Sequence, residues 1–419
     1  MILLLAAAAL ADPTFTDLGL LVTAPAEGPF AGGVNAPTVA WTGTQYVMYF
    51  ESPALAADVP SDCANSYSIG RATSPDGLAW TVDAAPVLAP DRADPVSLYS
   101  CSVASPGVVY ADGVYHLFFA MGDERQDSGS AINRAAGIAY ATSTDGVTFA
   151  VQQAPTPIGD YEDGIPTGEW HEPDGGGSST SVGMPTVTLI NDTLYLLYLS
   201  STSMYGAKYD LASSTWSLWD DAVSTGWLGT DWAAYGVYSP ALYCSDDETL
   251  TALVGGYTDA SYVSRGVGVA TSPDLVDWTV GAALAADSVP FDTINHVEVL
   301  PAGADLLLFY GMTDTESGKK AIGMGTTSTS WGTPDGRACE WEIPVDTGGG
   351  DTDTDTDADT DTDTDPDTDT DTAEPDTAWD TGEDVPDMIC ACTTGGGGAG
   401  TGVLAIALGA LALGRRRRG

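Results

Sequence analysis

Three copies of one motif constrain the fold of this chain more than any other feature. The stretch SIGRATSPDGLAW (68–80) returns as GIAYATSTDGVTF (137–149) and as GVGVATSPDLVDW (266–278). Each copy combines a strand-forming run, a Ser-x-Asp turn and an aromatic residue. Because motifs that return along a chain are typical of repeat architectures, the copies predict that one structural unit is used several times.

Paired apolar runs extend the repeat to five units. The longer member of each pair is rich in strand formers, and the five are QYVMYFES (45), VYHLFFAM (114), TLYLLYLS (193), TLTALVGG (249) and DLLLFYGM (305). A shorter strand-like stretch precedes each run, separated from it by turn residues as in a β-hairpin, and these stretches begin near 35, 104, 183, 238 and 295.

A third strand rich in Gly and Ala follows each pair, and in the motif copies a fourth strand begins at the aromatic residue. Five units of four strands, without helical periodicity, predict an all-β fold. We expect a five-bladed β-propeller over residues 12–345, in which residues 14–22 close the ring against the last unit. A β-sandwich is the alternative.

The charge of the chain is strongly unbalanced. It has 59 acidic and 13 basic residues among 419, a formal net charge of −46. Nucleic acid is disfavoured as a partner, since binding it needs a basic face. Such a surface is typical of a highly soluble protein, and attraction of a cationic partner is the alternative. We expect a monomer.

Both ends of the chain predict export. Residues 1–11 are apolar and end in Ala-Leu-Ala, a small-x-small pattern typical of a signal peptide. Residues 346–388 alternate Asp and Thr, and 346–387 hold 16 Asp and 2 Glu with no basic residue. This segment repels itself and has little apolar surface to bury, so we expect a disordered linker. Loose binding of Ca²⁺ by its carboxylates is a further hypothesis.

Residues 389–419 predict a sorting or membrane segment. Positions 395–414 carry no charge, and twenty helical residues span about 30 Å, enough to cross a bilayer core. Arg415 to Arg418 would then remain on the cytoplasmic side. The cysteines, the Gly-rich apolar run and the basic end resemble the MYXO-CTERM sorting signals of myxobacteria and relatives. The resemblance implies cleavage near Cys390 or Cys392 and display at the bacterial cell surface. A tail anchor that stays in place is the alternative.

Export places the other cysteines in an oxidising compartment. Four cysteines allow three connectivities, and proximity in the sequence favours the pairs Cys63–Cys101 and Cys244–Cys339. Free buried thiols are the alternative.

The pattern Tyr-x-x-Tyr/Phe-Phe/Tyr, followed by Ile-Gly-x-Ala-Thr-Ser-x-Asp-Gly-x-x-Trp, resembles the five-bladed propellers of glycoside hydrolase family 43 and its relatives. The resemblance covers about residues 30–340. It implies a central channel in which an Asp base, a second Asp and a Glu acid stand at the starts of the innermost strands. The nearest positions here hold Asn35, Ser105, Met184 and Ser239. None of these side chains can act as a general acid or base, whereas glycoside hydrolysis needs two carboxylates.

The resemblance gives His296 a channel role, because similar propellers carry a channel histidine beside a bound calcium ion. It therefore offers Ca²⁺ as a cofactor and His296 as its ligand, although the sequence itself requires no cofactor. An ordinary hydrogen-bonded histidine is the alternative. Glu298 lies two residues further and faces the same side of a strand. Glu298, Glu172 and Asp94 are the candidate catalytic carboxylates, with solvated acidic side chains as the alternative for the last two.

Aromatic residues suggest how a ligand is held. The stretch STGWLGTDWAAYGVYSP (224–240) contains Trp227, Trp232 and Tyr235, and flat rings of this kind stack against sugars. With Asn35 and His296 they are the candidate ligand-binding residues; packing between units is the alternative for the rings.

These features predict an exported, surface-displayed propeller that binds carbohydrate or acts in adhesion without the usual hydrolytic carboxylates. Its partner would be a glycan or another cell-surface ligand, with membrane contact through the C-terminal segment until processing. The alternative is a glycoside hydrolase acting on polysaccharides of the arabinose, xylose or galactose type.

Overall fold

A computed structural model of the chain describes residues 13–339 with several gaps. The gaps are 62, 64, 94–98, 123–125, 128–129, 132–134, 153–157, 162–181, 201–202, 219–222, 224–225, 246–248, 262–264, 285–288 and 335–337. The predicted signal peptide (1–11), linker (346–388) and C-terminal segment (389–419) lie outside the described residues. No helix within the described ranges is long and apolar enough to cross a membrane.

The described part of the chain is all-β, without helices, and its strands follow the five predicted units. The first strands are β2 (Asn35–Trp41), β6 (Ser102–Ala111), β13 (Val182–Ile190), β17 (Gly236–Ser245) and β21 (His296–Ala302). The second strands are β3 (Tyr46–Pro53), β7 (Val114–Gly122), β14 (Thr193–Ser200), β18 (Thr249–Tyr257) and β22 (Asp305–Thr313). The third strands are β4 (Tyr67–Ser74), β10 (Ala135–Ser143), β15 (Ser203–Asp210), β19 (Arg265–Ser272) and β23 (Lys320–Thr326).

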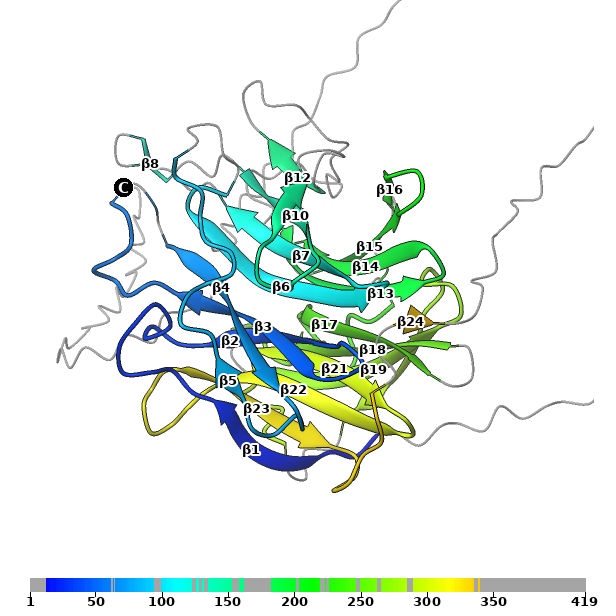
Figure 1. Ribbon diagram of the computed structural model, residues 1–419. Helices are drawn as coiled ribbons and strands as arrows, with labels where there is room; N and C mark the ends of the chain where they lie inside the picture. The colour runs from blue at the N-terminus through cyan, green and yellow to red at the C-terminus, as the bar shows by residue number, and fades with distance from the viewer. Residues whose placement is uncertain are drawn as a thin grey trace, which may run out of the picture.

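Short fourth strands complete the units in antiparallel order. In units 1 to 4 they are β5 (Thr81–Val82), β11 (Ala150–Gln152), β16 (Thr215–Leu218) and β20 (Thr279–Ala283). In unit 5 the fourth place is taken by β1 (Thr16–Val22), which pairs antiparallel with β23, as expected for residues 14–22 (Figure 1). The Tyr310 hydroxyl also donates a hydrogen bond of 2.5 Å to the Asp17 carboxylate. The start of the described chain is thereby joined to its last unit.

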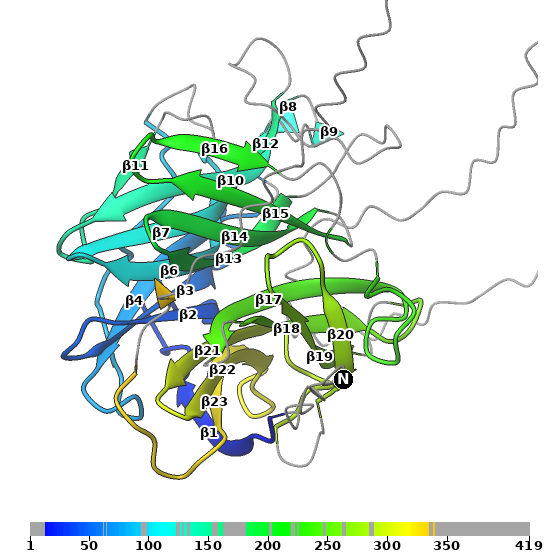
Figure 2. The same ribbon diagram turned by 90° about the vertical axis from the view of Figure 1, so that its right-hand side faces the viewer.

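The hydrogen-bonded sheets hold nine, five, four and four strands, with one further two-stranded ribbon in the described residues. The nine-stranded sheet contains units 1 and 2, joined by a parallel bridge from Tyr67 to Ser102. Four short strands lie outside the five units: β8 (Gln126–Asp127), β9 (Ser130–Ala131), β12 (Ile158–Tyr161) and β24 (Ala338–Cys339). β24 adds to β13 in parallel. β12 pairs with β10, beside which it lies in Figure 2.

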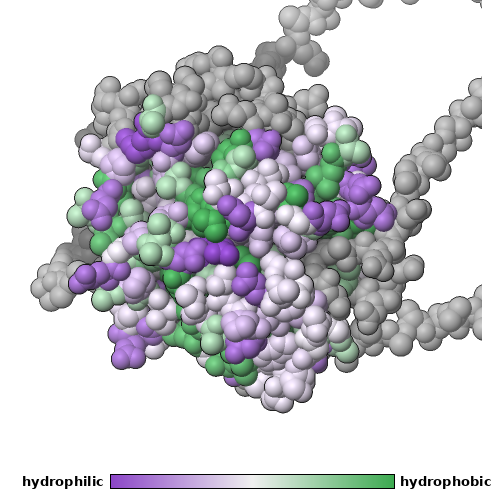
Figure 3. Space-filling view, viewed as in Figure 1, coloured by the Kyte–Doolittle hydropathy of each residue, from purple (hydrophilic) through white to green (hydrophobic). Residues whose placement is uncertain are grey.

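The apolar core lies between units rather than within them. Buried side chains of the described residues form five clusters, and each draws on two consecutive units. The cluster between units 5 and 1 contains Leu300 and Phe309 together with Val39 and Met48. A second strand buried on both faces must be apolar on both faces, which explains the continuous apolar runs in the sequence. On the face drawn in Figure 3 only small apolar areas remain, separated by polar residues.

The first strands contact one another in a fixed order. β2 contacts β6, β6 contacts β13, β13 contacts β17, β17 contacts β21, and β21 contacts β2. The five strands that open the units therefore meet at the centre of the molecule.

The repeated Ser-x-Asp motif forms the corner between third and fourth strands. In the first copy the Ser74 hydroxyl donates to Asp76 and accepts from the Gly77 backbone N–H, while Asp76 accepts from the N–H groups of Leu78 and Ala79 at 2.9 and 2.8 Å. The indole of Trp80 donates back to the Gly77 carbonyl. The copies at 143–149 and 272–278 repeat the Ser and Asp contacts.

One corner departs from glycine at its left-handed position. Gly77 and Gly146 have φ of 79° and 69°, and the third copy places Leu275 there with φ of 68°. A side chain in this conformation is strained. Leu275 is completely buried in the cluster between units 3 and 4, so its packing offsets the strain.

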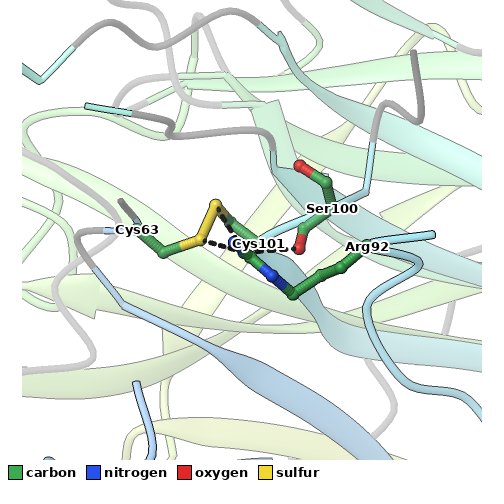
Figure 4. The surroundings of a disulfide bond; sticks show 4 residues. All are labelled: Cys63, Arg92, Ser100 and Cys101. Carbon is green, nitrogen blue, oxygen red and sulfur yellow. Dashed lines mark hydrogen bonds between the residues drawn. A yellow bond between two sulfur atoms is a disulfide. The ribbon is translucent and has the colours of Figure 1, made fainter. Parts of the chain in front are cut away.

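Cys63 and Cys101 form a disulfide with a Cα–Cα distance of 5.7 Å (Figure 4). Arg92 donates hydrogen bonds to the Cys63 sulfur at 2.8 Å and to the Ser100 carbonyl at 3.3 Å. The disulfide joins the loop after β3 to the residue directly before β6. Cys244 is disulfide-bonded as well. The side chain of Cys339 is outside the described set, so the pair Cys244–Cys339 stays a prediction.

We expect Asp76→Ala to lower the melting temperature by a few degrees, because two backbone N–H groups lose their acceptor. Those groups, from Ala79 and then Leu78, lower the pKa of Asp76 below its usual 3.8. A lowered carboxyl pKa contributes stability above the ordinary pKa, and that contribution is lost as the pH falls through the folded value. The difference from wild type should therefore be full at pH 7 and shrink below about pH 4. Calorimetry with exposed Asp231→Ala as the control measures it; equal melting temperatures at pH 7 would contradict this role.

Candidate functional site

A small hollow lies where the first strands of all five units meet. It is lined by Ala36–Pro37, Ser105–Pro106, Met184–Pro185, Ser239–Pro240 and His296–Glu298. Its volume is about 260 Å³, including space open to solvent. We call this space the central hollow. It has one carboxylate in its lining, that of Glu298, and one imidazole, that of His296.

Four of the five first strands enter the central hollow with the same backbone irregularity. Ala36, Ser105, Met184 and Ser239 each precede a proline and have φ between 42° and 52°. A register shift interrupts the pairing of each strand with its neighbour at this point. Residues before proline normally adopt an extended conformation, so these positions are strained. β21 has no proline at the hollow and no register shift, and it brings His296 and Glu298 there instead.

Side-chain oxygens bridge four of the five junctions between neighbouring first strands. Thr38 accepts from the Val108 N–H at 3.0 Å, and Thr186 accepts from the Leu242 N–H at 3.2 Å. Ser239 accepts from the Val297 N–H at 3.0 Å. Glu298 Oε1 lies 3.5 Å from the Val39 nitrogen, a long contact at the junction of units 5 and 1. We call these four contacts the inter-strand belt.

The fifth junction, between β6 and β13, is closed by direct backbone packing. A Cβ placed on Gly107 would lie 2.4 Å from the Pro185 carbonyl oxygen. Only glycine permits this approach. At the junction of units 5 and 1, Glu298 thus provides the side-chain acceptor that Thr or Ser provides at three other junctions.

A second buried carboxylate, Glu51 on β3, lies beneath the central hollow and connects three units. Its Oε2 accepts from the Ser105 N–H at 2.9 Å and from the Ser105 hydroxyl at 3.2 Å. Its Oε1 accepts from Asn35 Nδ2 at 3.0 Å, and the same nitrogen lies 3.2 Å from His296 Nδ1. Glu51 is fully buried, and Asn35 and His296 are 2% and 6% exposed. We call these three residues the buried chain.

Burial lowers the pKa of His296 to about 4, with Glu51 opposing the shift and Lys320 and Arg265 adding to it. The imidazole is therefore neutral at physiological pH. Its Nε2 atom is buried and has no hydrogen-bond partner among the described residues. In that part of the chain no group of three or more His, Cys, Asp or Glu side chains is placed to hold a metal ion.

The predicted ligand-binding residues and candidate catalytic carboxylates lie in different places. His296 and Glu298 both line the central hollow, on the same side of β21 as the strand alternation requires. Asn35 does not line it; Ala36 occupies the position before proline, and the Asn35 side chain turns into the buried chain. Glu172 and Asp94 lie outside the described residues.

The prediction that Trp227 and Trp232 grip a ligand is wrong for this structure. Trp227 is completely buried and packs edge-to-face on Trp278 at 5.3 Å between ring centres. Trp232 is 2% exposed, and a Cβ on Gly268 would lie 2.0 Å from its ring. Both rings fill the core, because the large apolar area of an indole gains most when buried. Tyr235 is 49% exposed, and its binding role stays a prediction.

Glu51 was not among the residues predicted from sequence. The signal was present, since Glu51 is the one charged residue in the apolar run QYVMYFES. A charged residue inside a strand that is buried on both faces needs partners, and such residues are seldom fully buried without them.

The fold is similar to that of solved glycoside hydrolases. A glycosyl hydrolase from Bacteroides ovatus matches with a TM-score of 0.54 and 13% identity, over 77% of this chain and 97% of that chain. The protein BT0996, solved in a complex with RGII, matches at 0.53 and 14%, over 78% and 96%. A family 117 glycoside hydrolase, Zg3597 of the marine bacterium Zobellia galactanivorans, matches at 0.51 and 13%, over 79% and 96%.

Sequence comparisons add no relative: no protein-family description matches the chain, and neither does any curated protein. At these identities the structural likeness shows the fold alone, an all-β fold like that of solved glycoside hydrolases, and not the activity.

We expect the stability of the protein to fall as the pH drops from about 6.5 to about 4, because the unfolded chain then binds a proton that His296 in the folded chain does not. The full effect is on the order of 3 kcal/mol for this one group. His116, whose pKa burial also lowers, adds to it. Urea unfolding between pH 7 and pH 4.5 measures the slope. His296→Gln should flatten it, and a wild-type slope in that variant would contradict the assignment.

Proposed function

We propose that the protein is a carbohydrate-binding protein whose central hollow holds a sugar without hydrolysing it. One observation carries the proposal: the lining of the hollow contains a single carboxylate, Glu298, and that carboxylate belongs to the inter-strand belt. Hydrolysis by the usual mechanism needs a pair of carboxyl groups flanking the bond. Ala36, Ser105, Met184 and Ser239 supply none.

The character of the hollow supports a sugar as ligand. Prolines 37, 106, 185 and 240 and Met184 present apolar surface, whereas His296, Glu298 and two serines provide polar groups. Apolar walls with a few placed hydrogen-bonding groups are typical of small-molecule sites. Structural neighbours in complex with RGII and with xylotriose agree with a glycan ligand.

Glycoside hydrolysis is the competing function, and the fold similarity favours it. It would combine Glu298 with a loop carboxylate such as Glu172 or Asp94, both outside the described residues. Glu51 is an unsuitable second group, because Asn35 and Ser105 already occupy its two oxygens from below the hollow.

We further propose that the five units are the blades of one propeller around the central hollow. The cyclic order of first-strand contacts supports this arrangement, as do the five core clusters between consecutive units. Each blade would contribute its first strand to the channel.

The proposal extends to location: the propeller is exported and displayed at the bacterial cell surface on the Asp-Thr linker. The apolar start, the acidic linker and the cysteine-containing, Arg-ended terminus of the sequence support it. Cys390 and Cys392 are the candidate processing residues.

We expect the purified full chain to bind glycans on an array and to release no sugar from arabinose-, xylose- or galactose-containing polysaccharides. Glu298→Gln should weaken binding at least tenfold, since a carboxylate that accepts from a sugar hydroxyl becomes a neutral amide. Glu316→Gln at an exposed position is the control. Sugar release that Glu298→Gln abolishes would instead establish the hydrolase.

Mass spectrometry of surface protein tests the location. We expect mature protein that lacks Arg415 to Arg418, and we expect Cys390→Ala with Cys392→Ala to retain an uncut, membrane-held form. A mature pool that ends at Gly419 would reduce the segment to an ordinary tail anchor.

A further inference from the structure

The buried chain determines which nitrogen of His296 carries its proton. A carboxylate only accepts hydrogen bonds, so the Asn35 atom 3.0 Å from Glu51 Oε1 must be the amide nitrogen. The same amide nitrogen is 3.2 Å from His296 Nδ1, so its second hydrogen is the one available for this contact. Nδ1 is thus an acceptor. Because the imidazole is neutral, its one proton resides on Nε2.

The Nε2 proton has no acceptor in the described part of the protein. Nε2 is buried, and it has no hydrogen-bond partner there. His296 is 6% exposed and lines the central hollow. Buried donors in folded proteins are almost always paired, so an orphan donor beside a hollow indicates a bound acceptor.

We propose that Nε2–H of His296 donates to an oxygen of a neutral, polyhydroxylated ligand in the central hollow, and that Asn35 and Glu51 position this donor. The inference rests on the proposed function, and it names the ligand group, a neutral oxygen, that His296 would recognise. Glu298 also lines the hollow, two residues away along β21. A sugar with neighbouring hydroxyls can accept from the imidazole and donate to the carboxylate, whereas an anion would meet the charge of Glu298.

The same proton position does not fit a calcium ion. A protonated Nε2 has no lone pair for a cation, and Nδ1 is engaged by Asn35. Calcium also takes six to eight oxygen ligands. We therefore replace the expected metal-ligand role of His296 with that of a hydrogen-bond donor.

The position of the proton can be measured without any ligand. The chain has three histidines, so ¹⁵N-histidine labelling of the full chain gives few signals, and His296→Gln identifies one of them. At pH 7 we expect two-bond ¹H–¹⁵N correlations of a neutral ring protonated at Nε2. A ring protonated at Nδ1, or at both nitrogens, would overturn the assignment.

A double variant that reverses the hydrogen bonds of the buried chain tests whether Asn35 and Glu51 position the His296 proton. We call this variant the inverted chain. Asn35→Asp with Glu51→Gln keeps the shapes and the net charge but reverses the hydrogen bonds, because the new amide at position 51 would donate to the new carboxylate at position 35. That carboxylate would in turn accept from Nδ1–H, so we expect the ¹⁵N signals to switch to the Nδ1-protonated form. The matched control makes the same two changes at exposed positions, Asn191→Asp with Glu316→Gln, and should keep the wild-type signals. If the inverted chain remains protonated at Nε2, Asn35 and Glu51 do not position the proton.

Titration with D-galactose, D-xylose and L-arabinose, each as its methyl glycoside, and separately with CaCl₂, tests the ligand. We expect at least one sugar to shift the His296 signals and to bind the inverted chain at least tenfold more weakly than the control variant. Equal affinity for both variants would overturn the donor role while leaving carbohydrate binding intact. Loss of the Nε2 proton on adding Ca²⁺ would instead support His296 as a metal ligand and contradict the donor role. If neither these sugars nor any arrayed glycan binds, both the proposed carbohydrate binding and the proposed ligand are contradicted. The position of the His296 proton is still decided independently by the ¹⁵N measurement.

Discussion

Backbone N–H groups at a buried strand edge need acceptors, and this requirement organises the centre of the molecule. Each first strand is an edge of its unit, yet it lies where the five units meet. Water cannot satisfy that edge, and a buried N–H without an acceptor is costly. The inter-strand belt supplies acceptors for some of these N–H groups. They are side-chain oxygens of Thr38, Thr186, Ser239 and Glu298, and each accepts from the neighbouring first strand. These hydrogen bonds fix the register between neighbouring units, in addition to the packing of their side chains.

The same strands carry strained backbone at the central hollow. Four residues before proline have positive φ, and each lies at a register shift in its strand. Strain of this kind persists only where the surroundings over-determine it, and it is concentrated at functional sites. Here the belt and the inter-unit core supply that support. β21 departs from the pattern, and it is the strand that contributes the imidazole and the carboxylate.

Both carboxylates near the hollow have structural partners among the described residues. Glu298 takes part in the belt, and Glu51 orients Asn35 and holds Ser105. A catalytic acid must be free to gain and lose a proton beside the substrate. In this fold, which is similar to that of glycoside hydrolases, Glu51 and Glu298 thus contribute to contacts between units, and we propose that Glu51 also positions His296 through Asn35.

The repeated motif and the apolar runs were sufficient to predict the all-β fold, the five groups of strands and the pairing of 14–22 with the last unit, because alternation and turn chemistry are local properties. Sequence also placed His296 and Glu298 on one side of one strand. It could not show that Trp227 and Trp232 are buried, since an aromatic residue suits a core and a ligand site equally well. Nor could it find the buried chain: Glu51, Asn35 and His296 are separated by up to 261 positions, and only the meeting of units 1 and 5 brings them into contact. The tertiary structure decided the proton position of His296, because a hydrogen bond between distant residues has no local signature in the chain.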